Sequence, residues 1–346
     1  DTALALIESG NADFVMMGRA MIADPELPNK LLEGRREDVR PCLRCNEYCI
    51  GRIWNYHTKL SCAVNPQAME EVRFQICKTD SPKNVVVIGG GPGGLEAARV
   101  AAIEGHKVTL FEKSGRLGGV MGAICTASFK ANIAAFTKWY EVQLEKLGVD
   151  VQLNTEITGN EEILASCDRI IIGCGAKPVT PPIPGIDGAH VVTILDAHKD
   201  ASRIQGEHIV VCGGGVSGCD GALEMAAEMG KKVTIVEMLP EVARDAMFIN
   251  KISLMNGLAK NQVRILTDTK VVSIQEDGVT VEKQDGTQEV LKADTVISAF
   301  GMKPDLTTVE AVKAKYHTKT RVVGDSKKLG KIGDAVREGF YAAASL

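Results

Sequence analysis

Four of the ten cysteines in this 346-residue sequence stand close together and could bind a metal. Cys42, Cys45, Cys49 and Cys62 form a C-x2-C-x3-C-x12-C array. Ten cysteines are too few for a disulfide scaffold at this length, and in a reducing compartment such a group indicates metal ligation. Three thiolates on a turn-rich loop, with a fourth after an excursion, suit the irons of one 4Fe-4S cluster. Structural zinc sites usually pair two short knuckles, so the pattern favours the cluster, and zinc is the alternative.

A glycine-rich turn indicates a second kind of chemistry, the binding of a dinucleotide. The apolar run Val85–Ile88 breaks into this turn, and a helical pattern follows it. Gly89 permits a tight turn, Gly91 lets the backbone approach a diphosphate, and Gly94 lets the helix pack close to its strand. The helix then points its free N–H groups at the phosphates. Glu112, at the end of the next predicted strand, is placed to accept hydrogen bonds from a ribose hydroxyl.

The same pattern occurs a second time, 124 residues further along the chain. A strand beginning near residue 209 leads into Gly213, Gly215 and Gly218, then into a helix through residue 229 and a strand that ends at Glu237. Two complete motifs with strand, helix and acid at the right spacing are far more specific than either one alone. The sequence therefore predicts two dinucleotide sites in one chain, and an α/β fold with parallel sheets.

Further elements are needed to position these residues, and hydrophobic periodicity predicts most of them. A helix-breaking polar segment at residues 79–82 marks a boundary before the first glycine motif. Antiparallel strands separated by a turn at residues 285–286 form a small meander after the second motif. The other expected elements are helices at 2–8, 129–147 and 335–346, a helix opening at Asp24-Pro25 and running through Leu32, a strand at 12–17 that ends at Gly18-Arg19, and strands at 149–153, 169–173 and 295–300.

Composition and charge argue against several classes of partner. The net charge is −4 with acids and bases interspersed, so no nucleic-acid or membrane partner is expected. No apolar run approaches the roughly 18 residues of a membrane span, and no signal peptide opens the sequence. We expect a soluble cytoplasmic protein with two or three domains. The sequence starts at Asp1 without an initiator methionine, so we expect a processed or incomplete chain.

From Val85 to Leu346 the sequence resembles the pyridine-nucleotide-dependent flavoproteins, in which a nicotinamide domain is inserted into an FAD domain. The resemblance implies that Gly175 lies near the adenine side of FAD and that Asp325, after Gly324, bonds the ribityl chain. Arg116 and Gly119 would lie along the diphosphate or the flavin, with a plain turn as the alternative. The first motif would hold FAD through Gly89, Gly91, Gly94 and Glu112, and the second would hold NADH through Gly213, Gly215, Gly218 and Glu237. The charge of Glu237 would repel a 2′-phosphate, which favours NADH over NADPH.

The segment GRAMIADPELPNKLLEGRREDVRPCLRCNEYC narrows the resemblance. It is similar to the junction of the old-yellow-enzyme-related iron-sulfur flavoproteins, such as the 2-enoate reductases, 2,4-dienoyl-CoA reductases and trimethylamine dehydrogenases. There a TIM barrel with FMN precedes the cluster loop. Gly18 and Arg19 would then be the end of an FMN phosphate site, and most of the barrel would be missing. The expected units are a barrel remnant at 1–37, a 4Fe-4S segment at 38–80, an FAD domain at 81–200 and 301–346, and an inserted NAD domain at 201–300.

This resemblance implies an electron relay from NADH to FAD, to the cluster, and to FMN in the barrel. FMN would reduce a small-molecule substrate, in this family usually one with an activated carbon–carbon double bond. The catalytic acid and base would lie in the missing barrel, so we name none here, and the layout allows a homo-oligomer. The alternatives are an NADH diaphorase that reduces a protein partner, a zinc-stapled nucleotide-binding module, and an amine-dehydrogenase-like enzyme in which electrons flow outward.

Overall fold

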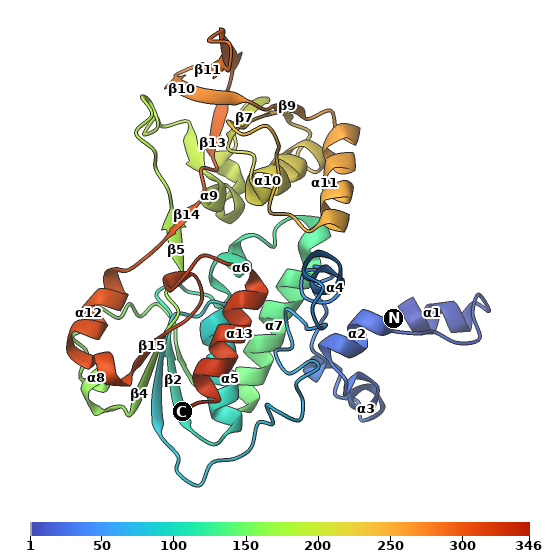
Figure 1. Ribbon diagram of the computed structural model, residues 1–346, viewed down its shortest axis with the longest axis vertical. Helices are drawn as coiled ribbons and strands as arrows, with labels where there is room; N and C mark the ends of the chain where they lie inside the picture. The colour runs from blue at the N-terminus through green and yellow to red at the C-terminus, as the bar shows by residue number, and fades with distance from the viewer. Residues whose placement is uncertain (1) are drawn as a thin grey trace.

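The computed structural model describes residues 2–346 as two lobes, each built on a five-stranded parallel sheet (Figure 1). The first lobe holds the first glycine motif and the second lobe holds the second. The predicted α/β fold class with two parallel sheets is therefore confirmed. Within residues 2–346, no helix combines the length and the apolarity needed to cross a bilayer.

The first sheet has the strand order β15-β4-β1-β2-β3, and every neighbouring pair is parallel. Its central strands are continuous apolar runs, as expected for a parallel sheet that is covered on both faces. The strand bounds are β1 Asn84–Ile88, β2 Lys107–Phe111, β3 Asp150–Gln152, β4 Arg169–Ile172 and β15 Thr320–Val322.

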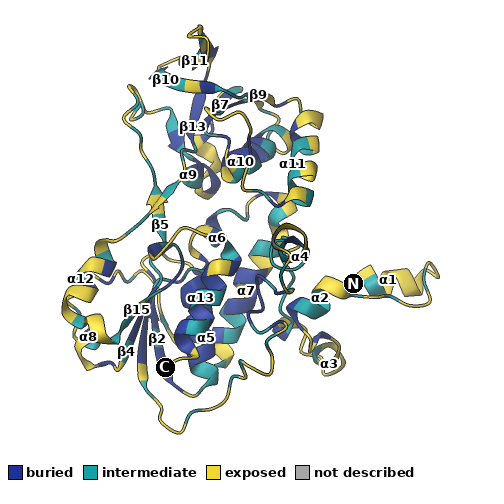
Figure 2. Ribbon diagram, in the orientation of Figure 1, coloured by how far each residue is buried: buried dark blue, intermediate teal, exposed yellow. Residues whose placement is uncertain are grey.

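Helices cover both faces of this sheet, and alternate residues of β1 point to opposite sides. Val85 and Val87 pack in one core cluster with α5, α7 and α13. Val86 and Ile88 pack in another, with α8 and α12. Figure 2 shows α5 as an almost wholly buried helix between the sheet and its neighbours. The helix bounds are α5 Pro92–Ile103, α6 Gly119–Ala123, α7 Ala131–Lys146, α8 Glu162–Ser166, α12 Thr307–Tyr316 and α13 Ile332–Ala343.

The second sheet has the order β6-β13-β7-β8-β9 and is also parallel throughout. Helices α9, α10 and α11 pack on one face, and a three-stranded antiparallel sheet, β10-β11-β12, packs on the other. The predicted meander is thus confirmed and covers the sheet. The bounds are β6 Val191–Thr193, α9 Ile194–Lys199, β7 His208–Cys212, α10 Val216–Ala227, β8 Lys232–Val236, α11 Phe248–Lys260, β9 Arg264–Leu266, β10 Thr269–Gln275, β11 Gly278–Lys283, β12 Gln288–Lys292 and β13 Thr295–Ser298.

Two antiparallel strands, β5 (Ala176–Pro178) and β14 (Met302–Pro304), join the lobes (Figure 1). The chain leaves the first sheet after β4, builds the second lobe, and returns through β14 to β15, which pairs with β4. The second lobe is therefore inserted into the first. It begins at β6, which pairs with β13, so the inserted part starts before residue 201, where the sequence pattern had placed it.

The N-terminal segment lies to the side of the first lobe as short helices and loops (Figure 1). Its helices are α1 Thr2–Glu8, α2 Gly18–Ala23, α3 Leu27–Leu32 and α4 Ile50–Tyr56. The prediction of a strand at residues 12–17 was wrong. Phe14 and Met16 are 92% and 96% exposed, and among residues 2–346 no strand lies beside this segment to complete its hydrogen bonds.

The helix predicted to open at Asp24-Pro25 begins two residues later, at Leu27. Asp24 nevertheless stabilises this turn, because its carboxylate accepts the backbone N–H of Glu26 at 3.1 Å and of Arg40 at 2.7 Å. Ends elsewhere differ by a few residues: α10 ends at Ala227, β13 ends at Ser298, and α13 runs earlier than predicted. Such ends depend on packing more than on local sequence.

Candidate functional site

The first glycine turn has the geometry that the sequence predicted. Gly89 has a φ of +103°, which favours glycine. A side chain at Gly94 would overlap the Gly89 carbonyl oxygen, so the start of α5 packs directly on the turn. At Gly91 an added Cβ would meet only the Gly173 oxygen, at 4.0 Å. The turn is therefore closed behind Gly89 and Gly94 and open at Gly91, where a diphosphate would approach the helix N-terminus.

The second glycine turn repeats this arrangement at the start of α10. Gly213 has a φ of +117°, and a side chain at Gly218 would overlap the Gly213 carbonyl oxygen. Nothing lies within 4 Å of the position of an added Cβ at Gly215. Both turns thus leave free space at their middle glycine, beside unpaired N–H groups of a helix.

Each predicted acid holds the turn of its own lobe. Glu112 accepts the N–H of Gly90 at 2.7 Å through one carboxylate oxygen, and Glu237 accepts the N–H of Gly214 at 2.7 Å in the same way. The other oxygen accepts a second backbone N–H in both lobes. A carboxylate has about four lone-pair sites, so each acid keeps acceptors for ribose hydroxyl groups.

The segment after Glu112 covers the first turn. Gly118 donates its N–H to the Gly90 carbonyl at 2.8 Å, and a Cβ at Gly119 would lie 3.1 Å from the Gly91 Cα. Gly119 therefore lies against the turn, where a diphosphate would pass, while Arg116 is exposed.

Residues far apart in the sequence meet beside the first turn. Gly175 follows β4 and donates its N–H to the hydroxyl of Ser326 at 2.6 Å. Gly324 donates to Glu338 of α13 at 2.9 Å, which fixes the turn that contains Asp325. Asp325 accepts the N–H of Gly330 at 2.9 Å, and burial raises the pKa of its carboxyl. The structure thus brings Gly175, Gly324 and Asp325 together at the carboxyl ends of β4 and β15.

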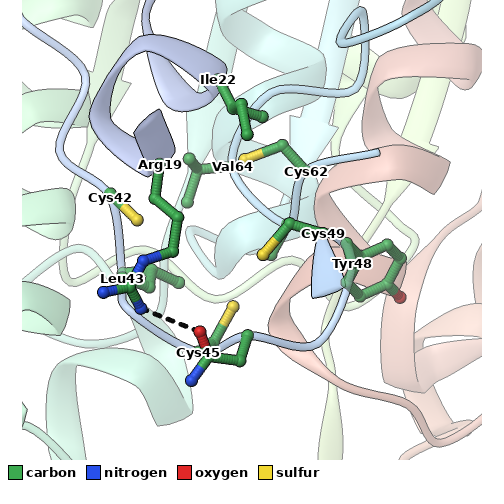
Figure 3. A pocket seen from close by; sticks show the side chains of 11 residues that line it. Arg19, Ile22, Cys42, Leu43, Cys45, Tyr48, Cys49, Cys62 and Val64 are labelled. Carbon is green, nitrogen blue, oxygen red and sulfur yellow. Dashed lines mark hydrogen bonds between the residues drawn. The ribbon is translucent and has the colours of Figure 1, made fainter. Parts of the chain in front are cut away.

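The four predicted cysteine ligands line one hollow, which we call the cysteine hollow. Figure 3 shows that all four sulfur atoms face the same space. Helix α4 begins directly after Cys49 and turns the chain so that Cys62 comes back to Cys42 and Cys45. The other lining residues are Arg19, Ile22, Leu43, Asn46, Tyr48, Ala63 and Val64.

Two of the thiols in this hollow are harder to ionise than an exposed cysteine. Burial raises the pKa of the Cys45 thiol to about 12, and burial also raises the pKa of Cys62. A metal ligand must be a thiolate, so a metal centre would have to supply the positive charge that offsets this burial.

Among residues 2–346, no three His, Cys, Asp or Glu side chains are grouped so that they could hold one metal ion. A zinc ion takes its ligands at about 2.0–2.3 Å from one point, whereas a cluster offers a separate iron to each thiolate.

Arg19, predicted at an FMN phosphate site, is a wall residue of the cysteine hollow (Figure 3). Its guanidinium donates to the side-chain oxygen of Asn46 at 2.8 Å. Gly18 is the first residue of α2 and has open space around its Cα. Arg19 therefore lies at the edge of the cysteine hollow, and Gly18 directly precedes this arginine in the chain.

Several residues that hold the hollow were missed by the sequence analysis. The buried guanidinium of Arg40 donates to the Val64 carbonyl at 3.0 Å and lies 4.8 Å from the Trp139 ring centroid. Tyr48 bonds Asp334 of α13. Arg40 and Tyr48 stand within three residues of a cysteine in the sequence, and this proximity could have indicated their role. Partners such as Trp139 are distant in the sequence, so no local pattern could have identified them.

Comparisons with known proteins agree with this geometry. Residues 83–328 match the family model described as pyridine nucleotide-disulphide oxidoreductase. An NADH oxidase of Thermoanaerobacter brockii is 38% identical over 344 residues, 98% of this chain and 52% of that protein. A cinnamate reductase of Clostridium sporogenes is 34% identical over 343 residues, 98% of this chain and 50% of that protein.

A solved structure shares nearly the whole arrangement. A complex of 2-naphthoyl-CoA reductase with 2-naphthoyl-CoA superposes with a TM-score of 0.94 at 32% identity, and the match covers 100% of this chain and 52% of that one. The chain thus spans about half the length of the relatives it matches. These relatives confirm the predicted resemblance to flavin oxidoreductases of the enoate reductase type. Because the family model covers well over half of its residues, the chain belongs to the pyridine nucleotide-disulphide oxidoreductase family.

Proposed function

We propose that this chain is the NADH-oxidising part of an iron-sulfur flavoprotein in which NADH, FAD, a 4Fe-4S cluster and FMN stand in series. The complete enzyme would reduce an activated carbon–carbon double bond. The observation that carries the proposal is a hollow lined by four cysteines next to two dinucleotide turns of matching geometry. The names of two relatives, cinnamate reductase and 2-naphthoyl-CoA reductase, describe the reduction of unsaturated compounds conjugated to a carbonyl group.

The first lobe fits FAD. Gly91 leaves room for the diphosphate, and Glu112 would accept hydrogen bonds from the ribose. Asp325 would bond the ribityl chain, with Gly175 near the adenine side. FAD, when bound, supplies the ability to accept a hydride and to release electrons singly. The residues of this chain bind and orient it.

The second lobe fits NADH. Gly215 leaves the approach to the N-terminus of α10 open. The carboxylate of Glu237 would accept the ribose hydroxyls and repel a 2′-phosphate, so NADH is favoured over NADPH.

The cysteine hollow fits a 4Fe-4S cluster, because four thiols line one space and a cluster takes one thiolate at each iron. Cys42, Cys45, Cys49 and Cys62 would be its ligands. Gly18 and Arg19 would form the edge of an FMN phosphate site, the rest of which would lie in another part of the complete protein.

The test is an anaerobic purification of the chain followed by titration with NADH. We expect one FAD and about four irons with matching acid-labile sulfide per chain. NADH should bleach the flavin absorption and produce the paramagnetic signal of a reduced cluster, while NADPH should do so only at much higher concentration.

Each alternative has its own outcome. Bound zinc without iron or sulfide would contradict the cluster and favour a zinc-stapled nucleotide-binding module. A flavin that NADH leaves oxidised would contradict the direction of flow and favour an amine-dehydrogenase-like enzyme. An upstream reading frame that encodes the barrel would eliminate a diaphorase that passes electrons to a partner protein.

A further inference from the structure

One side chain of the second lobe reaches the cysteine hollow. Asn250 lies in the first turn of α11, in the lobe that holds the second glycine motif. Its carboxamide nitrogen donates to the backbone carbonyl of Cys45 at 2.7 Å. Its carboxamide oxygen accepts the side-chain N–H of Asn46 at 2.8 Å. Asn250 therefore uses both ends of its amide on two consecutive residues of the segment that carries the four cysteines, residues 42–62, which we call the cysteine segment. These residues are about two hundred positions away from Asn250 in the sequence.

The backbone around Cys45 needs such support. Arg44 has a φ of +56° and Asn46 a φ of +57°, so two left-handed residues flank the cysteine. Asparagine tolerates this conformation, whereas arginine rarely adopts it. Local sequence thus disfavours the conformation of Cys45 seen here, and tertiary contacts must hold it.

Other contacts join the same two parts of the chain. Lys331 donates to the carboxylate of Glu47 at 2.9 Å and to the carbonyl of Asp245 at 2.8 Å. A Cβ at Gly51 would lie 3.4 Å from the side chain of Met247. The start of α11 and the residues before it therefore lie directly against the cysteine segment.

The segment that carries Asn250 also contacts the second glycine turn. Ala243 donates its N–H to the carbonyl of Gly214 at 2.7 Å. Four residues separate Ala243 from the start of α11 at Phe248. One short stretch of chain therefore touches both the nucleotide turn and the cysteine segment.

We propose that Asn250 is a positioning residue through which the nucleotide lobe holds Cys45 toward the cysteine hollow. The proposal rests on the proposed function only for the identity of what the hollow holds. The proposal states that the conformation of Cys45 depends on a residue of the second lobe. Loss of the Asn250 amide should let the Arg44–Asn46 backbone relax and expose the Cys45 thiol more often.

The experiment compares the full chain with three variants, Asn250→Ala, Asn250→Asp and Asn261→Ala, all purified anaerobically. Asn261 is a matched control, because it is a half-buried asparagine at the other end of α11 whose amide bonds Gly257 of the same helix. Each protein is pulsed with an alkylating reagent and digested with trypsin. The label on Cys45 is then measured by mass spectrometry relative to that on the exposed Cys77. Iron and acid-labile sulfide are measured on the same samples.

We expect Cys45 to be alkylated about three- to tenfold faster in Asn250→Ala, because the neutral hydrogen bonds that hold Cys45 and Asn46 are lost from a locally opening segment. Asn250→Asp should show a similar increase, since a carboxylate cannot donate to the Cys45 carbonyl. Asn261→Ala should match the unchanged chain. The two Asn250 variants should also release iron to a chelator faster.

Equal Cys45 labelling in the unchanged chain and Asn250→Asp would overturn the proposal, as would an equal increase in Asn261→Ala. If Asn250→Ala does not fold, judged by circular dichroism, Asn250→Asp decides. Absence of iron and sulfide from the unchanged chain would instead overturn the proposed function, and the labelling comparison would still decide the role of Asn250.

Discussion

The two glycine turns are alike in local geometry but differ in what surrounds them. In both, the first glycine of the motif has a positive φ, the third packs against its carbonyl, and an acid accepts the N–H of the residue that directly follows the first glycine. The first turn, however, leads into a helix that is buried from Gly93 to Ala101. Helix α13 packs so closely on α5 that a Cβ at Gly339 would overlap the Gly93 carbonyl.

The second turn has no counterpart of α13 within residues 2–346, and α10 keeps exposed positions. An enclosed turn suits a cofactor that stays bound, and an open turn suits a coenzyme that enters and leaves. The glycine pattern therefore determines the backbone geometry that contacts a diphosphate. The surrounding helices determine how far the site is closed to exchange of its ligand.

The largest expected difference between the lobes lies inside their helices. Glu96 of α5 is fully buried and accepts two hydrogen bonds from Arg99, at 2.8 and 2.9 Å, and one from Tyr140 at 3.1 Å. Asp220 occupies the equivalent place in α10 but forms a partly exposed ion pair with Lys130 at 3.0 Å. Glu96→Ala should lower the free energy of unfolding by about 3–5 kcal/mol, because it leaves the Arg99 charge buried and unpaired.

Asp220→Ala is the matched control and should cost about 0–1 kcal/mol. Urea unfolding of the FAD-loaded chain, followed by circular dichroism, measures both. Equal losses in the two variants would show that the helices are equally enclosed, contrary to the comparison above.

The next largest effect separates the two sites by function. Gly94→Ala and Gly218→Ala each place a methyl group against the carbonyl of the first glycine. Overpacking of this kind costs about 1–3 kcal/mol. Gly94→Ala should yield protein without FAD, whereas Gly218→Ala should retain FAD and bind NADH at least about tenfold more weakly.

Flavin content after gel filtration and the Kd for NADH by calorimetry test this pair. Loss of FAD in Gly218→Ala with retention in Gly94→Ala would reverse the assignment of the two sites.

A smaller effect is expected at the acid of the second turn. Glu237→Gln keeps the shape of the side chain but places an NH2 group opposite a backbone N–H of Gly214 or Leu239. We expect NADH affinity to fall about tenfold and the preference over NADPH to shrink, since the charge that repels a 2′-phosphate is lost. Calorimetry with both coenzymes measures this, and Glu241→Gln, an exposed acid paired with Lys251, is the control. An unchanged preference would exclude Glu237 as the discriminating residue.

The smallest effect concerns pH. Burial raises the pKa of the Glu224 carboxyl, but hydrogen bonds from His198 and Thr126 outweigh it, so the pKa lies below its usual value. A lowered folded-state pKa gives stability that is fully present above the unfolded pKa of about 4.3 and is lost as pH falls through the folded value. Thr126 belongs to the first lobe, so acid should loosen the contact between the lobes.

Thermal unfolding between about pH 6 and pH 3 should therefore show a steeper loss of stability in the unchanged chain than in Glu224→Gln. The buried pair of the first lobe, Glu96 and Arg99, contains a guanidinium that stays charged throughout this pH range. Identical pH slopes for the unchanged chain and Glu224→Gln would rule out Glu224 as the source.

Local patterns were enough to predict the parts of the molecule that are built within one strand-turn-helix unit. Strand β2 ends at Phe111, directly before Glu112 as predicted, and both turns have the predicted backbone geometry at their first and third glycines. The meander at β10–β12 and the gathering of four cysteines around one hollow also followed from spacing. The segment at residues 12–17 failed because an apolar run becomes a strand only when a neighbour completes its hydrogen bonds.

The sequence by itself determined the chemistry that each motif can perform, because a glycine's freedom, an acid's position after a strand and the spacing of cysteines are local properties. Only the tertiary structure decided that Glu96 and Arg99, an ordinary pair three residues apart on a helix, would be buried beneath Trp139 and Tyr140 of α7. Only the tertiary structure, likewise, placed Asn250 beside Cys45. Such contacts join residues that are distant in the sequence, and no local pattern records which surfaces will meet when the chain closes on itself.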